Sequence, residues 1–86
     1  MKLVIDITQE EIDYAQMVGL HNIVELSMTD PHIGNIIATE KHITFSTFDG
    51  WLSHHIVKTP TTLRTFLHRY HRKVPVFPIR VEVNYN

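Results

Sequence analysis

Apolar and polar residues alternate at the start of the chain and then change to a helical spacing. Residues 3–7 place apolar side chains at every second position, which predicts a short strand. Thr8 and Glu11 have the spacing of a capping box, so we expect a helix to begin there and to end near Gly19. The apolar residues of this helix, on one broad face, are Ile12, Tyr14, Ala15, Met17 and Val18.

The middle of the chain predicts several strands separated by turns. Residues 24–28 alternate apolar and polar positions and indicate a strand, although a helix that continues past the preceding glycine is an open alternative. Residues 29–35 are typical of a loop. Residues 36–39 and 42–48 then predict two more strands with a short turn between them.

Asp49-Gly50 is a strong hairpin signal between two runs of strand-forming residues. For a two-residue turn, we expect Phe48 to face Trp51 across the hairpin and Phe45 to face His54. Phe48 and Trp51 would then share the less apolar face of the hairpin, where both would be exposed. The other face would carry Ile43, Phe45, Leu52 and Ile56.

The last third of the chain predicts a helix followed by a strand. Thr59 and Pro60 are typical of an N-cap and a first helical residue. Pro75 disfavours helical backbone in the residue before it, so we expect the helix to end there. Residues 76–83 predict a closing strand whose prolines place its beginning at an edge or a bulge. The helix would present one apolar stripe, made of Leu63, Phe66, Leu67, Tyr70 and Val74.

Together these elements predict one small α+β domain that spans residues 1–86. The expected order is β-α-β-β-β-β-α-β, which we interpret as a mostly antiparallel sheet of four to six strands with two helices packed on one face. Hydrophobic residues make up 43% of the chain, as is typical of a globular domain. A chain of 86 residues has a thin core, so a partner chain would add stability.

Cysteine is absent, which excludes disulfides and thiolate ligands and favours a cytoplasmic location. No apolar run reaches the ~20 residues that a membrane span needs. The charges divide between the two halves: residues 1–40 hold seven acids and one base, whereas residues 41–86 hold seven bases and two acids. This division is consistent with a basic binding face, with attraction between two copies, or with halves that interleave in the fold.

Seven histidines are the one unusual feature of the composition. His54 and His55 are neighbours in a predicted strand and would point to opposite faces, whereas His68 and His71 lie three residues apart on a helix and can converge. Nearby cations oppose the binding of a divalent ion, so we expect solvated histidines without a metal or cofactor. The alternative hypothesis, a His-based metal site or ribonuclease, would use Arg64, His68, His71 and Arg72.

The predicted C-terminal helix also carries a basic face. Arg64, His68 and Arg72 are spaced by four residues and form one ridge. Arg69 and Lys73 lie beside this ridge. Such a face would bind an acidic protein surface, including the acidic half of a second copy, and nucleic-acid phosphates are the alternative. The sequence pI of about 6.6 favours a protein partner, because nucleic-acid-binding domains commonly exceed ~9.

Known enzyme motifs are absent: the chain lacks a glycine-rich phosphate loop, a nucleophile elbow and a His-Glu-x-x-His sequence. We therefore predict a small non-catalytic protein-interaction module, of the kind found among bacterial or phage accessory proteins, with a homodimer as one form. Its expected binding residues are Arg64, His68, Arg69, Arg72 and Lys73 on the helix and Phe48 and Trp51 at the hairpin tip.

Overall fold

The computed structural model describes residues 1–86, and its α+β class confirms the predicted class. The molecule is elongated, with extents of 39 × 22 × 17 Å. None of its three helices is long and apolar enough to cross a membrane. In chain order the elements are β1 (Lys2–Ile7), α1 (Gln9–Val18), α2 (Ile23–Ser27), β2 (Ile33–Ala38), β3 (His42–Phe48), β4 (Leu52–Lys58), α3 (Thr61–His71) and β5 (Ile79–Asn84).

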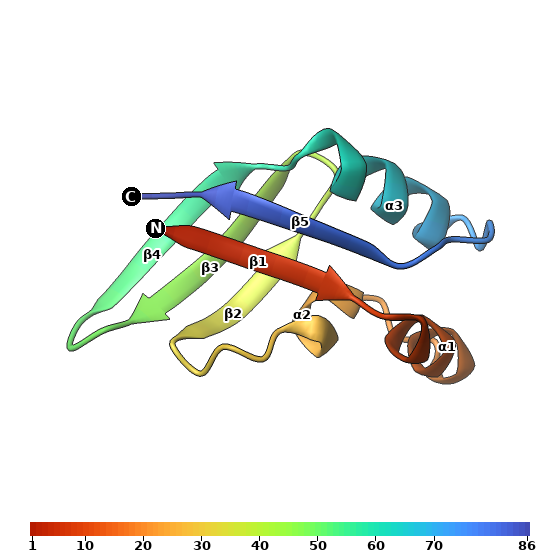
Figure 1. Ribbon diagram of the computed structural model, residues 1–86, viewed down its shortest axis with the longest axis horizontal. Coiled ribbons are helices and arrows are strands. Elements are labelled where there is room, and N and C mark those ends of the chain that lie inside the picture. The colour runs from red at the N-terminus through yellow and green to blue at the C-terminus, as the bar shows by residue number, and fades with distance from the viewer.

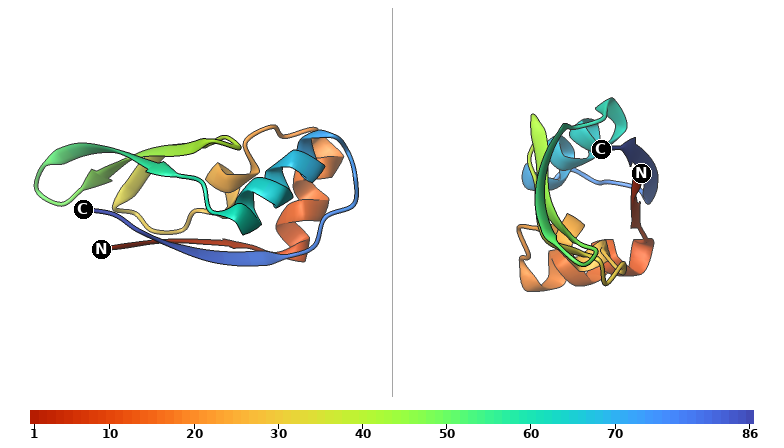
Figure 2. Two further views of the ribbon diagram at one scale, coloured as in Figure 1. Left: turned by 90° about the horizontal axis from the view of Figure 1, so that it is seen from above. Right: turned by 90° about the vertical axis from the view of Figure 1, so that its left-hand side faces the viewer.

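The five strands form two separate antiparallel sheets, whereas the sequence predicts a single sheet. β1 pairs with β5 along its whole length, and β2, β3 and β4 form a three-stranded sheet. Figure 1 shows the β1–β5 pair crossing in front of the three-stranded sheet. In the right panel of Figure 2 the two sheets form facing walls. The space between these walls holds the core.

The core is closed on two sides by helices. Figure 2 shows α3 on one side of the space between the sheets and α1 with α2 on the opposite side. The expectation that two helices pack on one face is therefore wrong. α2 contacts both β1 and β2, so it joins the two sheets. Seventeen buried hydrophobic residues form one cluster, to which every helix and strand contributes except β4.

Both ends of α1 form as the sequence predicts. The Thr8 side chain accepts a hydrogen bond from the Glu11 N–H at 3.3 Å, and the Glu11 carboxylate accepts one from the Thr8 N–H at 2.9 Å. These two bonds confirm the capping box. At the other end, Gly19 adopts a left-handed conformation with φ of 70°, which a residue without a Cβ reaches at little cost.

Residues 24–28 are not the strand that their alternation indicates, because most of them belong to α2. Ile23, Val24 and Ser27 are buried, and their spacing is that of one helical face. Asn22 precedes this helix, and its side-chain amide donates to a carbonyl of β2 at 2.9 Å. The segment therefore packs as one turn of helix against the sheet edge.

The beginning of α3 differs from the predicted N-cap. Pro60 occupies the N-cap position, and no side chain caps the helix. Thr59 is buried and donates its hydroxyl to the Thr39 carbonyl at 2.7 Å, so its side chain fastens the chain to the turn between β2 and β3. The apolar stripe is confirmed for Leu63, Phe66, Leu67 and Tyr70, which are all buried.

The end of α3 comes four residues before Pro75, at His71. Lys73 adopts φ of 61°, and the Val74 N–H bonds to the Arg69 carbonyl at 3.0 Å. This arrangement is a Schellman motif with a lysine at the position where glycine is preferred. Val74 therefore lies beyond the helix, 36% exposed, and is not part of the predicted apolar stripe.

Candidate interaction surfaces

The register between β3 and β4 differs by one residue from the predicted register. Phe48 lies opposite Leu52, because the hairpin loop contains the three residues 49–51. Gly50 takes φ of 77° in this loop. A shift of one residue exchanges the two faces of a strand. The predicted pairing of Phe48 with Trp51 is therefore wrong.

The same shift gives the three-stranded sheet an apolar outer face. Phe45 is buried on the inner face, opposite His55 and not opposite His54 as predicted. Leu52 and Ile56 were expected on the same face as Phe45. They lie instead on the side that faces solvent, where 53% and 66% of their surfaces are exposed.

We call the exposed apolar surface on this side the hairpin face. It consists of Ile37, Phe48, Leu52 and Ile56. Ile37 and Phe48 are 56% and 62% exposed. Phe48 pairs with Leu52 in one row, while Ile37 and Ile56 both lie opposite Thr44 in a second row. The solvent side of an antiparallel sheet is usually polar, and contiguous exposed apolar residues commonly mark an interaction site.

A shallow hollow of about 400 Å³ lies on the outer face beside the second row, where Thr44, Ser46, His54 and Ile56 line it. Ser46 and His54 are cross-strand partners in it, and the Ser46 Oγ is hydrogen-bonded to the His54 Nδ1 at 2.9 Å. The bond satisfies the buried Ser46 hydroxyl. The hairpin face is therefore an apolar surface with a polar, slightly recessed centre.

Trp51 lies on the other side of the hairpin, where it lines a groove of about 610 Å³ between the hairpin and the two chain termini. It is 79% exposed. Thr47 and His55 line the same groove, with the Thr47 Oγ1 and the His55 Nε2 hydrogen-bonded at 2.8 Å. Phe48 and Trp51, which the sequence places in one patch, are therefore on different surfaces.

The basic side of α3 is exposed, and it meets an acid from elsewhere in the fold. The His68 Nδ1 donates to the Glu40 carboxylate at 3.0 Å, so the turn between β2 and β3 lies beside the basic ridge. The Arg69 Nε donates to a carbonyl of the following loop at 3.2 Å. The predicted binding residues that take part in no ion pair are Arg64, Arg69, Arg72 and Lys73.

His68 and His71 engage different neighbours. The ring of His71 stacks on that of His21, with centroids 4.3 Å apart, and its Nε2 donates to the His21 carbonyl at 3.2 Å. Beside this stack, Tyr70 donates its hydroxyl to the Leu20 carbonyl, and burial raises the pKa of Tyr70. No group of three or more His, Cys, Asp or Glu side chains is placed to hold a metal ion.

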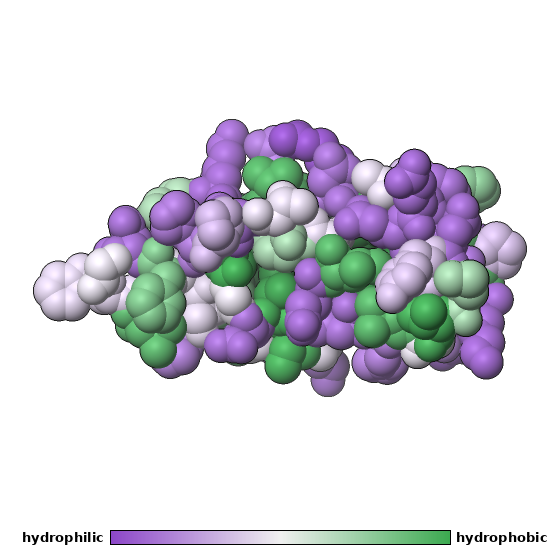
Figure 3. Space-filling view, turned by 90° about the horizontal axis from the view of Figure 1, so that it is seen from below, coloured by the Kyte–Doolittle hydropathy of each residue, from purple (hydrophilic) through white to green (hydrophobic).

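A second group of exposed apolar side chains lies on the underside of the molecule, over α1 and α2 (Figure 3). Tyr14, Val18 and Leu26 line a depression of about 330 Å³ there. Asn22 and Glu25 line the same depression, so polar groups interrupt this patch. A third group lines a groove of about 380 Å³ beside Phe77, together with Arg69. No Asp, Glu, Lys or Arg of β3 or β4 interrupts the hairpin face, whereas both other groups contain a charged residue.

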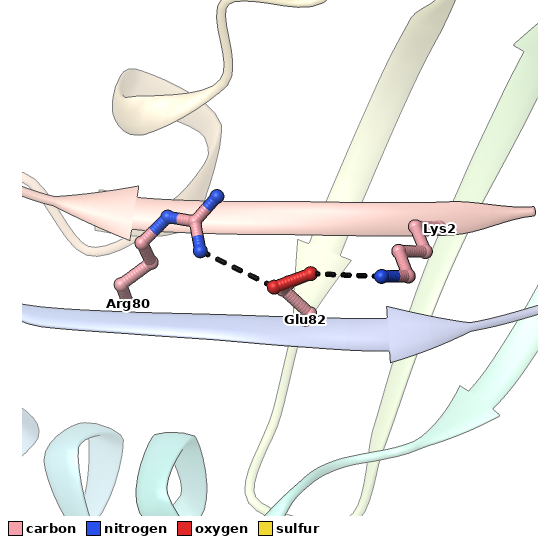
Figure 4. A network of polar contacts seen from close by, with 3 residues as sticks. All are labelled: Lys2, Arg80 and Glu82. Carbon is pink, nitrogen blue, oxygen red and sulfur yellow. Dashed lines mark hydrogen bonds and ion pairs between the residues drawn. The ribbon is translucent and has the colours of Figure 1, made fainter.

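Glu82 is the centre of an ion-pair network on the β1–β5 pair (Figure 4). Its carboxylate lies 3.3 Å from the Lys2 Nζ and 3.2 Å from an Arg80 guanidinium nitrogen. The hydrogen bond and the positive charge of Lys2, followed by the charge of Arg80, lower the pKa of Glu82. The network stabilises the pairing of the first and last strands.

No protein-family model, curated protein or solved structure matches this chain. Any proposal about the function of this chain therefore depends on its fold and its surfaces.

Proposed function

We propose that this chain is a non-catalytic protein-interaction module that binds a protein partner through the hairpin face. The observation that carries the proposal is the exposure of Phe48, Leu52 and Ile56 on the solvent side of a sheet. Burial of such residues is the main source of affinity in protein interfaces. Trp51 lies outside this surface, at the rim of the groove on the opposite side.

The position of β4 supports the same proposal. β4 is the only helix or strand with no residue in the buried core cluster, and it forms an edge of the three-stranded sheet. Lys58, at the end of the strand, is its only Lys, Arg, Asp or Glu, so no charged residue interrupts the hairpin face along β4. The proposal includes a cytoplasmic accessory protein, which the absence of cysteine supports.

The test compares the variant Phe48→Ser with the matched control Phe77→Ser. Phe77 is 74% exposed and lies outside the hairpin, so each variant removes one exposed phenylalanine. We expect Phe48→Ser to weaken partner binding by about tenfold or more, and Phe77→Ser to leave it unchanged. Equal binding by both variants and the unmodified chain would contradict the proposal.

The basic side of α3 supports a second candidate function, the binding of nucleic-acid phosphates. Arg64 and Arg72 are exposed on one ridge and take part in no ion pair. Binding of this kind would weaken steeply between about 50 and 200 mM salt, because it releases counterions. No binding of a DNA or RNA oligonucleotide at the lower salt concentration would exclude this candidate.

A further inference from the structure

We propose that the occupant of the hairpin face is a second copy of this chain, packed sheet against sheet. This inference rests on the proposed function and names its partner. The two outer faces would pack with their strands antiparallel, about a two-fold axis that lies between the copies, over the Ser46–His54 pair, and runs perpendicular to the strands. Three observations on the hairpin support this arrangement: the order of its rows, the charges at its ends, and its area.

The apolar rows of the hairpin face match under this two-fold rotation. Phe48 and Leu52 lie two residues from the Ser46–His54 pair on one side, and Ile56 lies two residues away on the other. At about 3.3 Å per residue, both rows are roughly 7 Å from the axis. The rotation therefore places the Phe48 row of each copy on the Ile56 row of the other. The hollow of about 400 Å³ is lined by Thr44 and Ile56, so it gives the Phe48 side chain of the other copy room to enter.

The two ends of the hairpin carry complementary charges. Asp49 is in the loop at the tip, while Lys58 and His42 are cross-strand partners at the base. No Asp, Glu, Lys or Arg lies on β3 or β4 between these ends. The same rotation brings the loop of each copy over the base of the other. Asp49, which borders the Trp51 groove at the tip of this loop, then comes near the Lys58 of the second copy, and the dimer has two such approaches.

The area of the face is sufficient for a weak dimer. β3 and β4 each have seven residues. A three-stranded sheet of that length measures about 23 Å by about 14 Å, which corresponds to roughly 600 Å² of accessible surface once the relief of the side chains is included. Two copies would bury about 1,200 Å², at the lower end of specific interfaces, where weak and transient complexes are found, so we expect a weak and reversible dimer.

Sedimentation equilibrium over a range of micromolar concentrations tests the dimer. The average mass should rise from 10.1 kDa toward twice that value as the concentration increases. Asp49→Lys and Lys58→Glu should each raise the dissociation constant by about tenfold, because each turns two attractive contacts into repulsive ones. The double variant should return to within about threefold of the original value.

Ile56→Ser should also weaken the dimer by about tenfold, and the control Phe77→Ser should not change it. Circular dichroism on each variant separates loss of association from loss of folding. A monomer at every concentration would overturn the dimer, while the proposed function would still hold if Phe48→Ser abolished binding to another protein. A dimer that neither Ile56→Ser nor the charge changes affect would overturn the sheet-to-sheet arrangement, and the proposed function would then fail only if Phe48→Ser also left binding to another protein unchanged.

Discussion

Phe48 and Leu52 are direct cross-strand partners, and both project from the solvent side of the hairpin. A two-residue turn would have turned Leu52 toward the core. The third loop residue, Trp51, changes the register by one and thereby gives the sheet its apolar outer face. The surface proposed for binding is thus a consequence of the length of one loop.

The register of β3 and β4 predicts that replacing two phenylalanines of β3 by alanine will lower the free energy of unfolding by different amounts. Phe45 is 2% exposed, whereas Phe48 is 62% exposed. Phe45→Ala should lower the free energy of unfolding by about 3–4 kcal/mol, because it leaves a cavity in the core. Phe48→Ala should lower it by less than about 1 kcal/mol. Urea unfolding of both variants measures this difference, and similar losses would contradict the two faces described.

Much of the local structure follows from the sequence, because its signals act over a few residues. The Thr8 capping box and the glycine at the end of α1 form as predicted, and the buried stripe of α3 forms except for Val74. The hairpin at Asp49-Gly50 forms as well. Each of these features depends on neighbours within one turn of helix or one pair of strands.

The remaining features depend on contacts that a pattern of apolar residues does not specify. Residues 24–28 alternate as a strand would, yet α2 forms because Ile23 and Val24 fill the space between β1 and β2. The separation of Phe48 and Trp51 onto different surfaces depends on one loop residue, which no periodicity encodes. Glu40 reaches His68 from 28 residues away, so the sequence alone overstates how unopposed the basic ridge is.

The left-handed backbone conformation of Lys73 predicts that a glycine at this position will make the chain more stable. Its φ of 61° is left-handed, which costs roughly 1 kcal/mol or more for a residue with a Cβ. Lys73→Gly should remove this cost and raise the free energy of unfolding by about 0.5–1 kcal/mol after the entropy of glycine is included. Thermal unfolding at neutral pH measures the change. A clear decrease in stability would contradict the Schellman motif at the end of α3.

Tyr70 predicts a loss of stability at alkaline pH. Burial raises its pKa above the ordinary value of 10.0, so the unfolded chain ionises at a lower pH than the folded chain. The stability that the neutral Tyr70 hydroxyl gives the folded chain is complete below pH 10.0 and is lost as the pH rises through the folded pKa. Tyr70→Phe should cost about 1 kcal/mol at neutral pH, because the hydrogen bond to Leu20 is lost. Its stability should also fall less steeply above pH 10.0, and an equally steep fall would contradict this assignment.

The ion pairs of Glu82 predict a loss of stability at acidic pH. Lys2 and then Arg80 lower its pKa below the ordinary 4.5, so the folded chain keeps the carboxylate charged where the unfolded chain takes up a proton. The stability that the charged Glu82 carboxylate gives the folded chain is complete above pH 4.5 and is lost as the pH falls through the folded pKa. Glu82→Gln should flatten the acid limb of a stability curve measured by urea unfolding. An unchanged acid limb would show that the exposed network adds nothing to the pairing of β1 with β5.

The central claim is that the hairpin face is the working surface of this chain. Nuclear magnetic resonance of the isotopically labelled protein during dilution tests it most directly, because each backbone amide reports its own contacts. The account predicts that concentration-dependent shifts gather at Ile37, Phe48, Leu52 and Ile56. Shifts confined to the basic ridge from Arg64 to Arg72, with none on β3 or β4, would contradict it.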